Sequence, residues 1–143
     1  MRVQDVIESR HEIFSIRDST TVDEAARYLR DRKLRAVGVL NGWGKLAGIV
    51  SQSDISEKVA AENKCPAWMR VSEIMSTELV TVTPETSLEE CLQLMEQNGI
   101  FHLVVLHDAE FFGLISAKDL LRFVADGHKA RADMLEAFVF PQH

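Results

Sequence analysis

The sequence lacks the features that mark membrane, secreted and nucleic-acid-binding proteins. Its 143 residues contain no long uninterrupted apolar run, so no transmembrane helix and no membrane partner are predicted. No apolar segment follows the first residues as a signal peptide requires, and we expect a cytoplasmic protein. The net charge of −6 disfavours nucleic acid as a partner, because affinity for nucleic acid comes largely from Lys and Arg. A small phosphorylated ligand stays open, since it needs only one or two local cations.

Cysteine is scarce, and histidine shows no metal-binding pattern. Cys65 and Cys91 have neither metal nor redox spacing, and they predict no disulfide framework. The five histidines include no helical i, i+4 pair and no cysteine partner, so we predict no metal site. No Ser-His-Asp order or paired-carboxylate pattern stands out, although spacing alone leaves a triad assembled in space open. We therefore predict no catalytic residue and no enzymatic activity.

What the sequence does contain is an internal repeat. The segment Gly-Ile-Val-Ser-Gln-Ser-Asp at 48–54 returns as Gly-Leu-Ile-Ser-Ala-Lys-Asp at 113–119. The match extends upstream, with an offset that changes from 68 to 66 to 65 between elements and stays constant within them. Length changes between elements are typical of loops. Because a unit of about 60 residues buries only a small core by itself, we expect the two copies to pack together.

Each copy predicts the order strand, helix, strand, strand, helix. Thr21 followed by Glu24, and Ser87 followed by Glu90, are capping-box patterns that predict the start of the first helix in each copy. Gly99 is expected to end this helix in the second copy. The predicted strands are 14–16, 36–40 and 45–50 in the first copy and 79–82, 102–106 and 110–116 in the second, and Asp54 and Asp119 open terminal helices at 55–62 and 120–125.

These features resemble the cystathionine-β-synthase (CBS) domain pair, also called a Bateman module. The specific element is the closing motif of glycine, two apolar residues, Ser or Thr, two variable residues and Asp, present twice at matching places. The resemblance covers residues 3–124 and implies an α/β (α+β) fold. Its tandem pseudo-twofold repeats are each β-α-β-β-α, with a small three-stranded sheet and two helices. We expect repeat one at 1–62, a linker at 63–70, repeat two at 71–126 and a C-terminal helical tail at 127–143, all in one compact domain.

The two copies depart from the family pattern in different ways. The family often has Arg followed by His at the entry to the second strand. Repeat one has Arg35 but then Ala36, whereas repeat two has Phe101 and then His102. We therefore expect two unlike sites, of which repeat one, with Arg35, suits a multiply charged ligand. Repeat two, with Phe101 for stacking and His102 as a neutral partner, suits a base with less phosphate.

The resemblance implies that an adenosine nucleotide (AMP, ADP, ATP, NAD or S-adenosylmethionine) binds between the repeats, with no other cofactor required. Asp54 and Asp119 would accept hydrogen bonds from ribose hydroxyls, and Ser51 and Ser116 would bind a phosphate oxygen beside a helix N-terminus. The alternative is that each Asp is only a helix N-cap and each Ser satisfies local backbone. The other predicted ligand residues line the base slot or supply charge, and four of them (Ile16, Val37, Val82 and Leu103) are also expected in the core; the set is Ser15, Ile16, Arg35, Ala36, Val37, Ser53, Lys58, Thr81, Val82, Phe101, His102, Leu103, Lys118 and Arg122.

Two functions remain open from the sequence. The first is a regulatory sensor that binds an adenosine nucleotide and changes the geometry of a dimer or a protein partner. The second is a structural or protein-interaction pair with vestigial ligand sites, in which the apolar residues of 134–140 form the contact surface. We expect a homodimer. Trp43 is expected to cover the first hairpin, and Trp68 to lie in the core or at a dimer contact.

Overall fold

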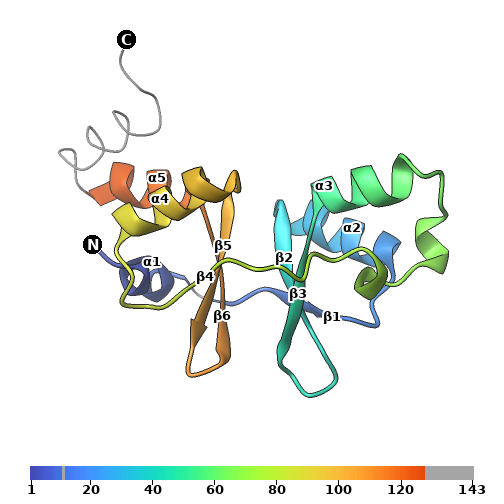
Figure 1. Ribbon diagram of the computed structural model, residues 1–143, viewed down its shortest axis with the longest axis horizontal. Helices are drawn as coiled ribbons and strands as arrows, with labels where there is room; N and C mark the ends of the chain where they lie inside the picture. The colour runs from blue at the N-terminus through green and yellow to red at the C-terminus, as the bar shows by residue number, and fades with distance from the viewer. Residues whose placement is uncertain (11, 128–143) are drawn as a thin grey trace, which may run out of the picture.

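The computed structural model describes residues 1–10 and 12–127 and contains two similar units side by side (Figure 1). Each unit has a three-stranded sheet in which the first two strands are parallel and the last two antiparallel. The predicted fold class and strand order are confirmed. The strands are β1 (Ser15–Arg17), β2 (Ala36–Leu40) and β3 (Leu46–Ser51) in repeat one, and β4 (Thr81–Val82), β5 (His102–His107) and β6 (Glu110–Ser116) in repeat two.

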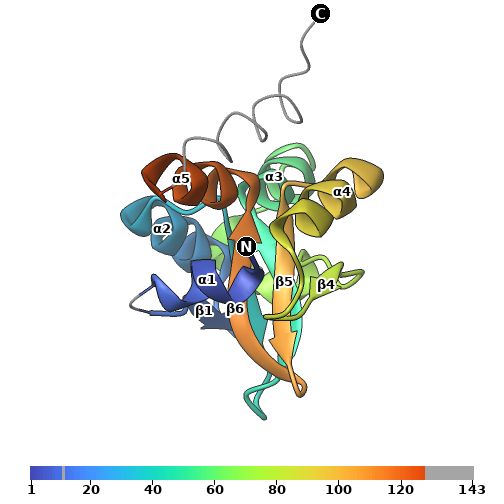
Figure 2. The same cartoon turned by 90° about the vertical axis from the view of Figure 1, so that its left-hand side faces the viewer.

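The longer helices gather on one side of the two sheets, and the β2–β3 and β5–β6 hairpins point away on the other side (Figures 1 and 2). The chain passes directly from the end of β3 into a helix at Gln52, and from the end of β6 into a helix at Ala117. The helical segments are α1 (Val3–Glu8), α2 (Val22–Arg32), α3 (Gln52–Ile55), the π-helix η1 (Ser56–Ala60), the 3-10 turns η2 (Pro66–Trp68) and η3 (Val71–Glu73), α4 (Leu88–Asn98) and α5 (Ala117–Gly127).

The helix that follows the first strand of each repeat begins where the sequence predicts. Thr21 Oγ1 accepts the backbone N–H of Glu24 at 3.4 Å, and Ser87 Oγ accepts that of Glu90 at 3.1 Å. These bonds satisfy backbone donors that the first turn of a helix leaves free. Gly99 follows α4 with a φ of 63°, a conformation that glycine adopts without a side-chain clash.

The terminal helices differ from the prediction at their starts. They begin at Gln52 and Ala117 instead of Ile55 and Leu120, and the helical chain after α3 continues as the π-helix η1. Serine, and not aspartate, therefore holds the N-cap position, so the interpretation of each Asp as an N-cap is wrong. The aspartate lies three residues farther on, where its carboxylate reaches back to the serine backbone.

The two cores exchange their first helical segments. α1 is the first element of repeat one in the chain, yet Val3 and Val6 are buried in the core of repeat two. Val71 and Ile74, which precede β4, are buried in the core of repeat one. Figure 1 shows α1 on the repeat-two side, and the backbone N–H groups of Val3 and Gln4 donate to Thr86 and Pro84, so the chain crosses between the repeats twice. The predicted limits of 1–62 and 71–126 follow the order of the chain, whereas each core draws on both halves.

Both tryptophans lie at the surface. Trp43 is 89% exposed and Trp68 is 86% exposed. The expectations that Trp43 covers the hairpin and that Trp68 lies in the core are therefore wrong, and a dimer contact through Trp68 stays a prediction. The apolar residues 134–140 lie outside the described residues. Within the described part of the chain, no helix combines the length and the apolar character needed to cross a membrane.

Candidate ligand sites

The repeated motif forms the same hydrogen-bonded turn in both repeats. The backbone N–H of Ser51 donates to Asp54 Oδ2 at 2.9 Å, and the N–H of Asp54 donates to Ser51 Oγ at 3.1 Å. Ser116 and Asp119 repeat this exchange, with both distances at 3.0 Å. Each serine–aspartate pair is thus held at a helix start with its carboxylate in a fixed orientation. The second carboxylate oxygen, Oδ1, is left for other partners.

In repeat one the protein itself uses this second oxygen. Asp54 is buried, with 8% of its surface exposed. Its Oδ1 accepts a hydrogen bond from Ser76 Oγ at 3.3 Å and lies 3.4 Å from Lys58 Nζ. Lys58 Nζ also donates to the carbonyl oxygen of Ile74 at 3.0 Å. A buried carboxylate needs such partners, and here Asp54 ties α3 and η1 to the segment before β4.

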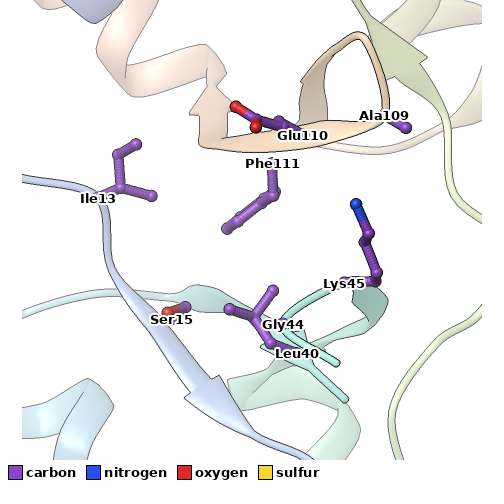
Figure 3. A pocket seen from close by; sticks show the side chains of 8 residues that line it. All are labelled: Ile13, Ser15, Leu40, Gly44, Lys45, Ala109, Glu110 and Phe111. Atoms are coloured by element: carbon purple, nitrogen blue, oxygen red, sulfur yellow. The ribbon is translucent and has the colours of Figure 1, made fainter. Parts of the chain in front are cut away.

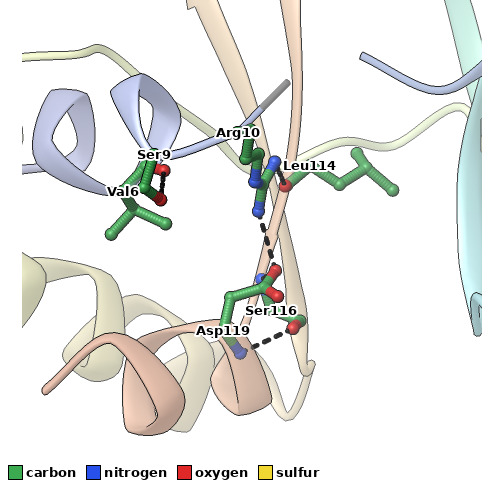
Figure 4. Close-up of polar contacts among 6 residues, drawn as sticks. All are labelled: Val6, Ser9, Arg10, Leu114, Ser116 and Asp119. Carbon is green, nitrogen blue, oxygen red and sulfur yellow. Dashed lines mark hydrogen bonds and ion pairs between the residues drawn. The ribbon is translucent and has the colours of Figure 1, made fainter. Parts of the chain in front are cut away.

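In repeat two the carboxylate is more open. The side chain of Asp119 is 37% exposed, and its Oδ2 lies 2.8 Å from Arg10 Nη2 (Figure 4). Arg10 Nη1 donates to the carbonyl oxygen of Leu114 at 2.5 Å, which fixes the guanidinium against β6. Within residues 1–10 and 12–127, no hydrogen bond reaches Asp119 Oδ1. Asp119 therefore retains an acceptor that an incoming hydroxyl can use.

Each motif lies beside the entry to the second strand of its own sheet, as the prediction requires. Ala36 pairs with Ser51 in the sheet register, and His102 pairs with Ser116. The carbonyl oxygens of Arg35 and Phe101 accept the backbone N–H groups of Gln52 and Ala117, at 2.9 and 3.1 Å. The side chain of Phe101 is 72% exposed and is free to stack on a planar group.

His102 has an environment that favours the neutral form of its imidazole. Burial lowers the pKa of its imidazole below the ordinary value, because the charged form loses hydration. The negative charge of Asp119 opposes this effect, and the positive charge of Arg35 adds to it. Arg35 of repeat one therefore lies within electrostatic reach of the repeat-two site.

The other predicted ligand residues divide into core residues and exposed residues. Ile16, Val37, Val82 and Leu103 are core residues with at most 8% of their surface exposed, as was also expected for them. Ser53, Thr81, Lys118 and Arg122 are exposed. Their ligand roles stay predictions.

A cavity lined by the two hairpins lies away from both motifs. It has a volume of about 320 Å³ and opens between the two hairpin ends (Figure 3). Ser15 is the one predicted ligand residue in its lining, and the side chain of Phe111 projects into it. The lining residues are Ile13, Ser15, Leu40, Gly44, Lys45, Ala109, Glu110 and Phe111.

Two residues at the sites, Arg10 and Ser76, were missed in the sequence. Both belong to the segments before the first strand of a repeat, where the offset between the copies changes and no residue pairing is defined. A signal was present in the glycines that open the two motifs. A Cβ on Gly48 would lie 2.6 Å from the carbonyl oxygen of Ser76, and one on Gly113 would lie 3.3 Å from Arg10 Nη1. Because each glycine lacks a side chain, a residue from a distant segment can approach the strand there, and the motif by itself does not show which residue this is.

A comparison with protein-family models also divides the chain into two similar units. The model of the CBS domain matches the chain twice, at residues 3–61 and 71–126. The chain belongs to the CBS domain family. The match covers most of the sequence and confirms the resemblance found from the repeated motif. A CBS domain pair is a regulatory module.

Known CBS proteins support the same assignment. The mitochondrial CBS domain-containing protein CBSX3 of Arabidopsis thaliana is 31% identical over 83% of this chain, which spans 60% of that protein. A CBS-domain protein structure from Burkholderia ambifaria has a TM-score of 0.83 at 28% identity and covers 90% of this chain and 97% of that one. The CBS domain pair of protein MJ0100, solved with 5′-methylthioadenosine and S-adenosyl-L-methionine, has a TM-score of 0.77 at 22% identity, covering 88% and 97% of the two chains. At that identity the likeness concerns the fold.

Proposed function

We propose that this CBS domain pair is a regulatory module that binds an adenosine nucleotide at the site around Asp119. The observation that carries the proposal is the difference between the two carboxylates. Asp119 keeps 37% of its side chain exposed and has Oδ1 open, whereas Asp54 is buried and bonded within the chain. A carboxylate with an open oxygen can accept ribose hydroxyls, and the exposed ring of Phe101 offers a stacking surface for a base.

The neighbouring groups suit such a ligand. Ser116 Oγ lies at the start of α5, where backbone N–H groups favour a phosphate oxygen. His102 is half-buried and its pKa is lowered by burial, which favours the neutral imidazole, a form that can both donate and accept a hydrogen bond. The complex of protein MJ0100 with two adenosine compounds supports this class of ligand for the present chain.

The test compares nucleotide binding by the two aspartate variants in isothermal titration calorimetry. Asp119→Asn keeps an amide oxygen that can accept the N–H of Ser116, but it loses the charge that strengthens hydrogen bonds from ribose. We expect it to lower the affinity for the tightest-binding ligand among AMP, ATP, NAD and S-adenosylmethionine by about tenfold. Asp54→Asn is the matched control and should leave that affinity within about twofold. Equal weakening by both variants would contradict the assignment to Asp119.

The alternative is a structural or protein-interaction pair whose sites no longer take ligand. The observation that favours it is in repeat one, where Ser76 and Lys58 already occupy the carboxylate of Asp54. If no adenosine compound binds the wild-type protein at millimolar concentration, this alternative holds for both repeats. The homodimer and the cytoplasmic location stay predictions, and sedimentation of the wild-type chain measures the first.

A further inference from the structure

Arg10 joins the two repeats at the proposed ligand site. It belongs to the segment between α1 and β1, but its guanidinium contacts Leu114 and Asp119 of repeat two (Figure 4). The side chain of Arg10 is 26% exposed, so the ion pair opens to solvent together with the carboxylate. We propose that Arg10 makes the Asp119 site selective for phosphorylated adenosine nucleotides over uncharged adenosine, because its guanidinium binds the phosphate. This inference rests on the proposed function.

The guanidinium has donors to spare for this role. It carries five N–H groups, and the contacts with Leu114 and Asp119 use one on each terminal nitrogen. A planar guanidinium can present two parallel N–H groups to a phosphate. When ribose hydroxyls compete for Asp119, the guanidinium can move its bond from the carboxylate to the phosphate and stay paired. The ion pair thus prepares both ligand-binding groups before the nucleotide arrives.

The charges around the two motifs agree with this assignment. At repeat two, Arg10 offsets Asp119, and the exposed Arg35 adds a positive charge within electrostatic reach of His102. Lys118 and Arg122 on α5 are also exposed, and they add two positive charges to the helix that begins at the motif. At repeat one, Lys58 offsets the buried Asp54. The phosphate ligand is therefore assigned to repeat two, in contrast to the sequence-based expectation for repeat one.

In repeat one, Ser76 makes the contacts that Arg10 makes in repeat two. There the backbone N–H of Ser76 donates to the carbonyl oxygen of Ile49 at 2.8 Å, and Ser76 Oγ donates to Asp54 Oδ1 at 3.3 Å. At repeat two, the two nitrogens of one guanidinium make the corresponding contacts with Leu114 and Asp119. At this position repeat one has the neutral Ser76 and repeat two has the cationic Arg10, whereas the cation at repeat one, Lys58, comes from the helix that follows the motif.

The test measures AMP and adenosine binding to the wild-type protein and to Arg10→Gln by calorimetry. The two ligands differ only in the phosphate, so their affinity ratio isolates its contribution. We expect Arg10→Gln to lower the affinity for AMP by about tenfold or more. The affinity for adenosine should stay the same or increase, because Arg10 no longer competes with the ribose hydroxyls for Asp119. Arg10→Lys keeps the charge without the planar fork and should give an intermediate ratio.

Two variants serve as controls. Arg17→Gln changes the net charge equally at an exposed residue of β1, and Ser76→Ala removes the corresponding contact at Asp54. Both should keep the preference for AMP. Two results would overturn the role of Arg10 while the proposed function stands. One is that Arg10→Gln binds AMP as tightly as the wild-type protein, and the other is that it loses affinity for AMP and adenosine equally. A wild-type protein that binds neither ligand would overturn both.

Discussion

At the scale of single residues, the two repeats solve the same local problem with different side chains. The hydroxyls of Ser51 and Ser116 each accept the backbone N–H of the aspartate three residues later, and each aspartate carboxylate accepts the backbone N–H of its serine. The environments then diverge, because Asp54 is buried and Asp119 is half-exposed. A change at either aspartate therefore affects a helix start, and a substitution by asparagine separates that role from ligand binding.

His102 provides a prediction for the pH dependence of stability. Burial lowers the pKa of its imidazole in the folded protein below the ordinary value of 6.5, so the unfolded chain binds more protons as the pH falls. The free energy of unfolding should decrease from pH 6.5 downward, until the pH passes below the lowered pKa of the folded state. Urea unfolding between about pH 8 and about pH 5 measures this loss, which should be smaller in His102→Gln.

A matched variant separates this effect from those of other titrating groups. His107→Gln removes an exposed histidine at the end of β5, and its profile shows how much the loss of any histidine contributes. If His102→Gln and the wild-type protein lose equal stability on acidification, burial of His102 does not set the pH dependence.

At the scale of elements, the glycine that opens each motif allows a neighbouring segment to approach the last strand. In repeat one, Ile49 and Ser76 exchange backbone hydrogen bonds of 2.8 and 3.0 Å. This short bridge joins β3 to the segment before β4, and Gly48 lies directly beside it. The absence of a side chain at Gly48 is therefore a requirement of packing between elements.

The prediction at this scale is that Gly48→Ala destabilises the protein. Its Cβ would lie 2.6 Å from the carbonyl oxygen of Ser76, and that backbone atom cannot move without breaking the bridge. We expect a loss of about 1–3 kcal/mol in the free energy of unfolding, measured with urea. Gly42→Ala is the control, because nothing lies within 4 Å of its new Cβ. Equal stability of the two variants would show that the bridge yields easily.

At the scale of the whole molecule, the exchanged segments make the repeats depend on each other. Val3 and Val6 of α1 complete the core of repeat two, and Val71 and Ile74 complete the core of repeat one. Arg10 and Ser76 lie on the same two crossing segments, so each candidate site also includes a residue from outside its own sheet. Neither repeat retains its full core if it is cut from the other.

The resulting prediction is a single cooperative unfolding transition. Val6→Ala removes buried methyl groups from repeat two, and Ile74→Ala does so in repeat one; each should lower stability by about 1–4 kcal/mol. Because the cores are linked, each variant should shift one common calorimetric peak whose calorimetric and van't Hoff enthalpies agree. A second peak, or a shift confined to one of two peaks, would show that the repeats unfold independently.

The features that the sequence alone predicted correctly depend on local patterns. The doubled motif, the caps at Thr21 and Ser87 and the stop at Gly99 involve residues only a few positions apart, and they determined the repeat, the order of the elements and the family. The same short range placed Ser51 and Ser116 beside their aspartates.

Only the tertiary structure decided which carboxylate is open and what stands beside it. Arg10 and Asp119 are 109 positions apart, and Ser76 and Asp54 are 22 apart, so no spacing rule connects them. Their contacts arise because α1 and the segment before β4 each cross to the opposite core, where buried apolar side chains hold them. Burial then closes the site at Asp54 and leaves the site at Asp119 accessible, a difference that the shared serine–aspartate spacing of the two motifs does not encode.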